Sequence, residues 1–162
     1  MERLMGLAEA IGTMLKQRDE TVAVCESAAG GLISAALLAV PGASAYYLAG
    51  SVVYTHDARR GVLGLTGDQV TMQGASEEFA DIMARTMREK VGATWAVGET
   101  GAAGPTGSRY GHDAGHVALA VVGPVDRAAT VETGLADREE NMWRFAEEAL
   151  RLLEDAISDA SG

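Results

Sequence analysis

Hydrophobic residues recur at helical spacing in three parts of the chain, and each part predicts an amphipathic helix. The first helix is expected to end at Arg18-Asp19-Glu20. The second is expected from Ser76 to about Lys90, and the third follows Asp137, whose side chain can cap it. The three hydrophobic stripes are Leu4, Leu7, Ala8, Ile11, Met14 and Leu15; Phe79, Ile82, Met83 and Met87; and Met142, Phe145, Ala149, Leu152 and Leu153.

Short hydrophobic runs between these helices predict strands, because they are rich in valine and bounded by Gly or Pro. The segment Gly123-Pro124-Val125-Asp126 indicates a hairpin between the last two strands. Short helices are expected from Leu32 to Val40 and from Asp57 to Leu63, ended by Gly64, while 45–48 is expected to be helical or irregular. The predicted strands are Thr21–Cys25, Gly50–Thr55, Ala93–Gly98, His116–Val122 and Ala128–Thr133.

This alternation of helices and strands favours a layered α/β sandwich with a mixed sheet. The length of 162 residues suggests a single domain spanning 1–162, with a tail that frays from about Ser158. Hydrophobic residues make up 48% of the chain, which is enough for a sizeable core. The sequence contains no visible repeat, linker or second domain.

The charge balance limits the classes of partner. Thirteen basic and 23 acidic residues give a formal net charge of -10, which would repel nucleic acid and an anionic membrane. A small anionic ligand remains possible, because local arginines and backbone N–H groups can hold it. No apolar run is long enough to span a membrane, and no signal peptide is visible, so a cytoplasmic location is expected.

The cysteine and histidine content gives no metal-binding pattern. Cys25 is the single cysteine, so no internal disulfide can form, and a small apolar strand residue is its simplest interpretation. The three histidines are scattered, and we therefore expect no metal site. Of these, His112 is expected to be solvated in a polar loop and His116 to lie in a strand.

Two loops of small residues follow predicted strands and are the candidate sites. They read "CESAAGG" at 25–31 and "ETGAAGPTGS" at 99–108. Open α/β sheets bind ligands at the carboxyl ends of strands. The first loop also leads into a helix, whose free N–H groups suit an anion. Neither loop fits a standard phosphate-binding fingerprint, so two purely structural turns remain an alternative.

Polar side chains beside these loops are the candidate reactive groups. Ser27 can be a nucleophile or a helix cap, and Glu26 can orient a ligand or pair with an arginine. Tyr54 and His56 are two residues apart at the end of the next strand and would share a face, or they form a solvated strand end. The Thr100 hydroxyl can point into a cleft or bond to its own backbone.

Several segments together resemble the C-terminal domain of the CinA (competence/damage-inducible) family. The resemblance covers roughly Leu4 to Glu154, and the blocks occur in the family's order. Longer members carry an additional N-terminal domain, so this chain is similar to a stand-alone form. The matching segments are "VAVCESAAGGLISAALLAVPGAS", "GSVVYTHDARRGVLGL", "GASEEFADIMA", "VGETGAAGPTG" and "GLADREENMWRFAEEALRLL".

The resemblance implies a nicotinamide-nucleotide amidohydrolase with a three-layer α/β/α sandwich fold. Such an enzyme hydrolyses the carboxamide of nicotinamide mononucleotide to nicotinic acid mononucleotide and ammonia. The expected partner is a small mononucleotide substrate, with no metal, no organic cofactor, no nucleic acid and no membrane. The resemblance also implies a homo-oligomer.

The family's motifs place its site residues on this chain. Ser27 matches the serine of "ESCTGG" and would attack the carboxamide carbon. Backbone N–H groups near Gly30 or Gly101 would stabilise the oxyanion. The remaining matched positions are Glu26, Gly30 and Gly31 in the first loop, Tyr54 and Arg59 in the "YSNxxK" block, Thr100, Gly101 and Gly104 in "TGxAGP", and Arg138 at the start of the last helix.

Two departures from the family pattern affect the chemistry. Ala28 and Ala29 replace a thiol and a hydroxyl, which removes a hydrogen-bond donor. Arg59 replaces the family's lysine, and an arginine that stays protonated can hold a phosphate or an oxyanion but is a poor general base. The base could instead be His56 or Tyr54. Alternatively, the domain binds a nucleotide and has lost or altered hydrolysis, or it has a purely structural role.

Overall fold

A computed structural model describes residues 1–160, and their helices and strands alternate along the chain. The strands are β1 (Val22–Glu26), β2 (Tyr47–Val52), β3 (Trp95–Ala102), β4 (His116–Val122) and β5 (Arg127–Glu132). The helical segments are α1 (Glu2–Arg18), α2 (Leu32–Ala39), η1 (Ala43–Ala45), α3 (His56–Ala58), η2 (Arg59–Leu63), α4 (Asp68–Thr71), α5 (Glu77–Val91) and α6 (Arg138–Asp159).

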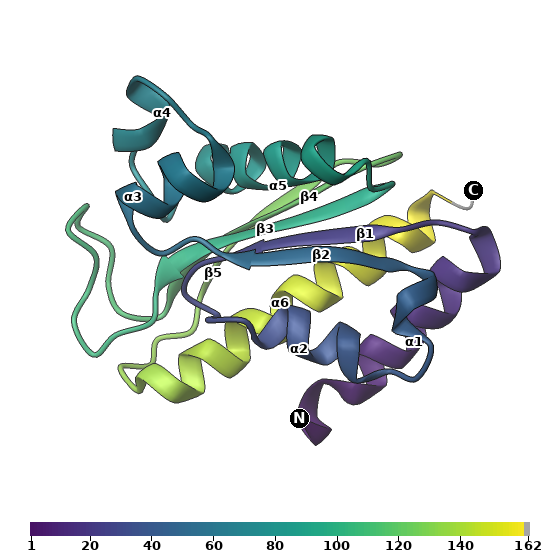
Figure 1. Cartoon of the computed structure of the whole chain (residues 1–162). Coiled ribbons are helices and arrows are strands. Elements are labelled where there is room, and N and C mark those ends of the chain that lie inside the picture. The colour runs from purple at the N-terminus through teal and green to yellow at the C-terminus, as the bar shows by residue number, and fades with distance from the viewer. Residues whose placement is uncertain (161–162) are drawn as a thin grey trace.

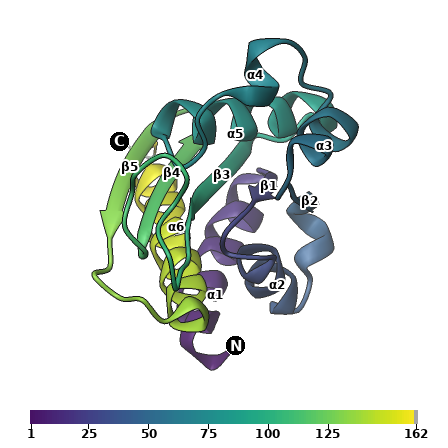
Figure 2. The same ribbon diagram turned by 90° about the vertical axis from the view of Figure 1, so that its left-hand side faces the viewer.

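Within residues 1–160, the five strands form one mixed sheet in the order β2-β1-β3-β4-β5. β1 pairs in parallel with both β2 and β3, whereas β4 is antiparallel to β3 and to β5. Helices α1, α2 and α6 cover one face of the sheet, and α5 with α3 and α4 lies on the other (Figures 1 and 2). The fold is therefore the expected three-layer α/β/α sandwich.

Strand β1 shows how the sheet separates two hydrophobic cores. Its residues are all buried, and successive side chains point to opposite faces. Val22 and Val24 join the core under α1, α2 and α6, while Ala23 and Cys25 join the core under α5. Cys25 is thus the buried strand residue that the sequence predicts, and burial raises the pKa of its thiol to about 12.

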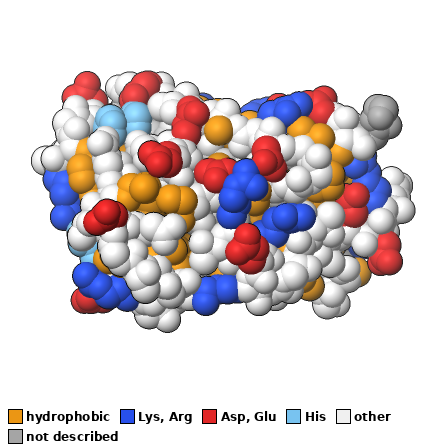
Figure 3. All heavy atoms as spheres, turned by 90° about the horizontal axis from the view of Figure 1, so that it is seen from above, with side chains coloured by type: hydrophobic (Ala, Val, Ile, Leu, Met, Phe, Trp, Pro, Cys, Tyr) orange, Lys and Arg blue, Asp and Glu red, His pale blue; other side chains and the backbone are white. Residues whose placement is uncertain are grey.

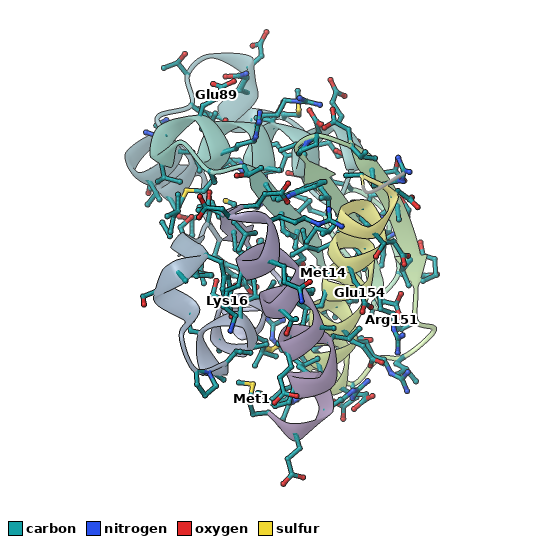
Figure 4. The ribbon with its side chains drawn as sticks, turned by 90° about the vertical axis from the view of Figure 1, so that its right-hand side faces the viewer. Met1, Met14, Lys16, Glu89, Arg151 and Glu154 are labelled. Atoms are coloured by element: carbon teal, nitrogen blue, oxygen red, sulfur yellow. The ribbon has the colours of Figure 1, made fainter. Side chains whose placement is uncertain are left out.

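The long helices follow the predicted stripes. Residues at helical spacing on α1 are fully buried, and α1 packs beside α6 on the same face (Figure 4). Ser76 caps α5 by accepting the Phe79 N–H, and Asp137 caps α6 by accepting the Glu140 N–H. Figure 4 also shows Lys16 pointing from α1 toward the segment after α2, where its ammonium lies near the Pro41 carbonyl.

Several predicted strand boundaries are wrong. β2 begins at Tyr47 and ends at Val52, earlier than the predicted Gly50–Thr55, and the helical turn before it is η1. β3 runs from Trp95 through Ala102, so its last four residues belong to the sheet and not to a loop. They remain strand because each pairs with a residue of β4, ending with Ala102 opposite His116.

The helix boundaries also differ in detail. Thr55, and not Asp57, caps α3 by accepting the Ala58 N–H at 3.1 Å. The turn that follows, η2, is a π-helix that ends at Gly64 as predicted. At the other terminus, α6 continues to Asp159, and residues 161–162 lie outside the described residues.

Acidic and basic side chains alternate on the face that carries α4 and α5 (Figure 3). Arg85 on α5, for example, bonds both Asp81 and Asp126. This mixing keeps large single-sign patches off the face despite the net charge. Across residues 1–160, no helix is both long and apolar enough to cross a membrane.

Candidate functional site

A cavity of about 300 Å³ opens where the parallel strands β1, β2 and β3 end. Strands that run in parallel bring their carboxyl ends to the same edge of the sheet, as the sequence predicts. The two small-residue loops therefore meet at one site. The predicted residues that line the cavity are Ser27, Tyr54, His56, Arg59, Thr100, Gly101, Gly104 and Arg138.

The lining carries positive charge without a compensating acid. Its charged side chains within the described chain are Arg59, Arg109 and Arg138, and His56 is a further titratable group. No Asp or Glu of residues 1–160 is among the lining residues, although the chain has 23 of them. A cavity with this composition favours an anionic ligand.

The first loop presents the Ser27 hydroxyl to the cavity. Ser27 follows directly on β1 and is half-buried. No hydrogen bond within residues 1–160 involves its hydroxyl, so this group is available to a ligand. The next residue, Ala28, also lines the cavity and leaves room beside Ser27.

Glu26 does not point into the cavity. Its carboxylate is fully buried and accepts the N–H groups of Gly31, Ile33 and Ser34 at 2.8 to 3.0 Å, together with the Ser34 hydroxyl. It therefore caps the N-terminus of α2 from inside the protein. The prediction that these free N–H groups form an anion site is wrong, because Glu26 already occupies them.

Gly30 and Gly31 lie beside the cavity but are not among its lining residues. Both have positive φ, 68° and 100°, which glycine adopts without strain. The Gly30 N–H bonds the Ser27 carbonyl, and the Gly31 N–H bonds Glu26. The pair thus shapes the turn between β1 and α2, and its N–H groups are not free to bind an oxyanion or a phosphate.

A second buried carboxylate, Glu99 on β3, holds the other side of the same bend. Glu99 is fully buried, and its Oε2 accepts the N–H groups of Ser27 at 2.9 Å and Ala29 at 2.8 Å. Its Oε1 has no hydrogen-bond partner among the described residues. Burial raises the pKa of Glu99 to about 7, and the hydrogen bonds from the loop oppose that rise.

Thr100 places a hydroxyl in the cavity from the opposite face of β3. It is 5% exposed, and its oxygen accepts the Ala75 N–H at 3.1 Å. The hydroxyl proton is therefore left to donate toward a ligand. Ala75 and Gly74, in the turn before α5, line the cavity beside it.

Arg59 is buried and fixed in place by the protein. One guanidinium nitrogen donates to the carbonyls of Val70 and Met72 at 2.9 and 2.8 Å, and the group stacks 3.8 Å above the Phe79 ring. Burial lowers the pKa of Arg59, and the nearby Tyr110 opposes this effect. The side chain lends positive charge to the cavity while it holds the turn at 70–72.

Tyr54 and Arg138 form one side of the cavity mouth. Arg138 donates to the Tyr54 hydroxyl at 2.8 Å and to the Gly104 carbonyl at 2.7 Å. Tyr54 is 60% exposed, so the pair is in reach of solvent. These contacts join the end of β2, the second small-residue loop and the start of α6.

His56, the first residue of α3, has a nitrogen with unmet hydrogen-bonding capacity. Its Nε2 is buried and has no hydrogen-bond partner among residues 1–160. The residue lines the same cavity as Ser27.

The comparisons with known proteins agree with the fold. The family model of the CinA C-terminal domain matches residues 4–157. The chain belongs to this family. A "CinA-like protein" from Anaeromyxobacter sp. (strain K) is 40% identical over 152 residues, which are 93% of this chain and 37% of that protein. Another from Salinibacter ruber is 39% identical over 89% of this chain. The chain thus spans little more than a third of the length of these relatives.

Solved structures of CinA proteins have nearly the same fold. The competence/damage inducible protein CihA from Agrobacterium tumefaciens is 32% identical, with a TM-score of 0.87 over 96% of both chains. A CinA superfamily protein from Klebsiella pneumoniae 700603 is 25% identical, with a TM-score of 0.89, over 96% of this chain and 98% of that one.

Several cavity residues of this CinA domain had no signal in the sequence analysis. Arg109 and Tyr110 come from the polar loop after β3, which lines the cavity. His112 lies in the polar loop as predicted and is half-buried, with its ring stacked on His116 at a centroid distance of 3.9 Å. His116 lies in β4 as predicted, and its ring bonds Glu132 and the Ala75 carbonyl. Glu99 also went unpredicted, although an acidic residue directly after a hydrophobic strand segment could have indicated a buried carboxylate.

Proposed function

We propose that the chain hydrolyses the carboxamide of nicotinamide mononucleotide to nicotinic acid mononucleotide and ammonia. The observation that carries the proposal is the composition of the cavity lining. Within the described residues, the lining contains no Asp or Glu, and it combines Ser27, whose hydroxyl makes no hydrogen bond there, with Thr100 and three arginines. Membership of the CinA C-terminal domain family supports the same reaction. Each part of the substrate finds complementary chemistry in the cavity lining.

The phosphate is expected at the cavity mouth. Arg109 and Arg138 are exposed cations on the lining. A guanidinium group can donate two parallel hydrogen bonds to phosphate oxygens. The buried Arg59 adds a further positive charge to the cavity, although one of its nitrogens already donates to two backbone carbonyls. The predicted phosphate contacts therefore move from the backbone of Gly30 and Gly31 to these side chains.

Ser27 is the proposed nucleophile. Its oxygen attacks the carboxamide carbon while its proton passes to the base, and the Thr100 hydroxyl donates to the developing oxyanion. The C–N bond then breaks, and the base returns the proton to the departing ammonia. Water attacks the acyl-enzyme in the same way, and the ester oxygen leaves as the Ser27 hydroxyl. No metal or organic cofactor is needed for these steps.

His56 is the proposed base. Arg59 matches the family's lysine in position, but a guanidinium does not give up its proton near neutral pH. Histidine can accept a proton in this range, and the Nε2 of His56 is buried without a partner within the described residues. The Tyr54 hydroxyl is instead engaged with Arg138. This favours His56 over Tyr54.

A nucleotide-binding module without hydrolysis is the second candidate. The observation in its favour is Arg59, whose guanidinium bonds the backbone at 70–72 as a structural side chain would. Such a module would keep the charged cavity and lose turnover. Thermal stabilisation by nicotinamide mononucleotide without ammonia release would identify it.

Ammonia release from nicotinamide mononucleotide tests the proposal. The wild-type chain should release ammonia, Ser27→Ala should reduce the rate to background, and His56→Gln should lower kcat at least about 100-fold. Ser34→Ala is the matched control, because it removes a serine hydroxyl from α2 that bonds Glu26 outside the cavity. Wild-type protein that binds the nucleotide without releasing ammonia would contradict the amidase.

A further inference from the structure

Glu99 is a fully buried carboxylate next to the proposed active site, and the mechanism above does not use it. It lies on β3 directly before Thr100. Because successive strand side chains point to opposite faces, Glu99 faces away from the cavity that Thr100 lines. Its Oε2 instead reaches across to the β1 loop and accepts the N–H groups of Ser27 and Ala29.

We propose that Glu99 is the positioning residue for Ser27, because its carboxylate fixes the bend 27–29 relative to Thr100. The proposal rests on the proposed function, which makes Ser27 the nucleophile. Two hydrogen bonds of 2.9 and 2.8 Å to one oxygen fix both ends of a three-residue turn. Charge-assisted bonds of this kind are stronger than neutral ones.

The connection joins the two loops that build the site. Ser27 follows β1, whereas Thr100 belongs to β3, and Glu99 binds the backbone of the first from the strand of the second. Without this contact, the bend would be held locally by the Gly30 N–H on the Ser27 carbonyl at 3.2 Å. A displacement of a reacting group by about 1 Å can cost roughly 100-fold in rate.

The surroundings of Glu99 make this contact sensitive to pH. The titratable group on the same face is Glu26 on β1, whereas the Cys25 thiol lies on the opposite face of the sheet. The cross-strand neighbour of Glu99 on β4 is Leu119. The buried side chains of α2 and α6 on this face are hydrophobic, apart from the neutral Asn141. With no cation in this set, burial raises the pKa of Glu99 to about 7, and Glu99 changes charge in the neutral range.

The experiment compares wild type with Glu99→Gln and Glu99→Ala. Gln keeps a carbonyl acceptor for the two N–H groups but cannot ionise, whereas Ala removes the acceptor. In ¹⁵N-labelled wild type, the amide signals of Ser27 and Ala29 should titrate together near neutral pH. In Glu99→Gln the same signals should be present but should not titrate.

Kinetics supply the second readout. Glu99→Ala should lower kcat for ammonia release at least about 30-fold and change KM by less than about threefold, while Glu99→Gln should recover most of the rate. The matched control Ser34→Ala removes a bond to the other buried carboxylate, Glu26, and should leave kcat unchanged. Circular dichroism checks that each variant is folded.

The outcomes separate the two proposals. Glu99→Ala with wild-type kcat, or Ser27 and Ala29 amides that do not follow Glu99, would overturn the positioning role. Absence of ammonia release from wild type would refute the proposed function, and the amide titration would still decide whether Glu99 holds the bend. If Glu99→Ala does not fold, the pH profile of Glu99→Gln decides: a profile identical to that of wild type would overturn the proposal.

Discussion

Glu26 and Glu99 lie near the ends of neighbouring strands, and each carboxylate binds backbone N–H groups of the protein itself. Glu26 takes those at the start of α2, and Glu99 takes those of the bend at 27–29. Main-chain donors in the first loop are therefore unavailable to a ligand. The capacity of the cavity for anions comes from side chains, chiefly Arg109 and Arg138.

The raised pKa of Glu99 predicts a pH dependence of stability. The folded chain binds this proton more tightly than the unfolded chain, so the stabilisation is present below the unfolded pKa near 4.5 and is lost as pH rises through about 7. A shift of this size corresponds to about 3 kcal/mol. Urea unfolding between about pH 4 and about pH 8 should show wild type losing that much more stability than Glu99→Gln. Parallel curves for the two proteins would contradict a titrating Glu99.

The site residues that local sequence patterns indicate could be predicted, whereas those whose roles depend on the path of the folded chain could not. Ser27 and Thr100 were identified because each hydroxyl stands beside small residues after a hydrophobic run. The capping role of Glu26 is not predictable from local sequence, because it lies five to eight positions before the N–H groups that it accepts and depends on how the loop turns back. Local sequence does not indicate the role of Glu99, because its partners Ser27 and Ala29 are 72 and 70 residues away.

At the level of elements, the segment from α3 to α4 is held together by Arg59. The π-helix η2 directs this side chain inward, where it supports the Val70 and Met72 carbonyls and covers the Phe79 ring. Lysine at this position, as in the family motif, could not make the same planar contacts. Arg59 thus stabilises the cavity wall in addition to charging it.

Arg59→Lys is expected to destabilise the chain by about 1 to 3 kcal/mol, because buried carbonyls lose their donor and the stacking on Phe79 is lost. The melting temperature should fall by roughly 2 to 4 °C for each kcal/mol. Arg60→Lys is the control: Arg60 is exposed and pairs with Asp57, and its change should stay within about 0.5 kcal/mol. Equal melting temperatures for the two variants would contradict a structural role for Arg59.

Helices were more predictable than strand ends. The caps Ser76 and Asp137 and the hydrophobic stripes define α5 and α6, because these signals lie within one or two turns of chain. Local sequence predicts a loop at the end of β3, because Thr100 and Gly101 resemble turn residues. They pair instead with Ala118 and Val117 of β4, which is a contact that local sequence does not specify.

At the scale of the whole molecule, a chain of net charge -10 carries a cavity lined by arginines. The order of strands and helices determined the layered fold, and parallel β1, β2 and β3 placed distant loops at one edge. The sequence could therefore predict that Ser27 and Thr100 meet. It could not predict Arg109, because the path of the loop after β3 depends on tertiary contacts such as those of His112.

If the arginines bind the phosphate, a ligand with a phosphate should stabilise the fold more than the same ligand without it. In Ser27→Ala, which should bind without turnover, nicotinamide mononucleotide at about 100 times its Kd should stabilise the fold by about 2.7 kcal/mol. Nicotinamide riboside, which lacks the phosphate, should stabilise it less at equal concentration. Arg109→Ala should reduce the difference between the ligands, and Arg127→Ala, whose arginine pairs with Asp159, should preserve it. Equal shifts with both ligands would contradict a phosphate site.

The central claim is that Ser27 attacks the carboxamide carbon inside this cavity. Acid-quench peptide mass spectrometry during turnover of nicotinamide mononucleotide tests it most directly. We predict an acyl adduct of the nicotinate mononucleotide on the peptide that contains Ser27 in wild type, and none in Ser27→Ala. Ammonia release that continues in Ser27→Ala at the wild-type rate, without an adduct in either protein, would contradict the account.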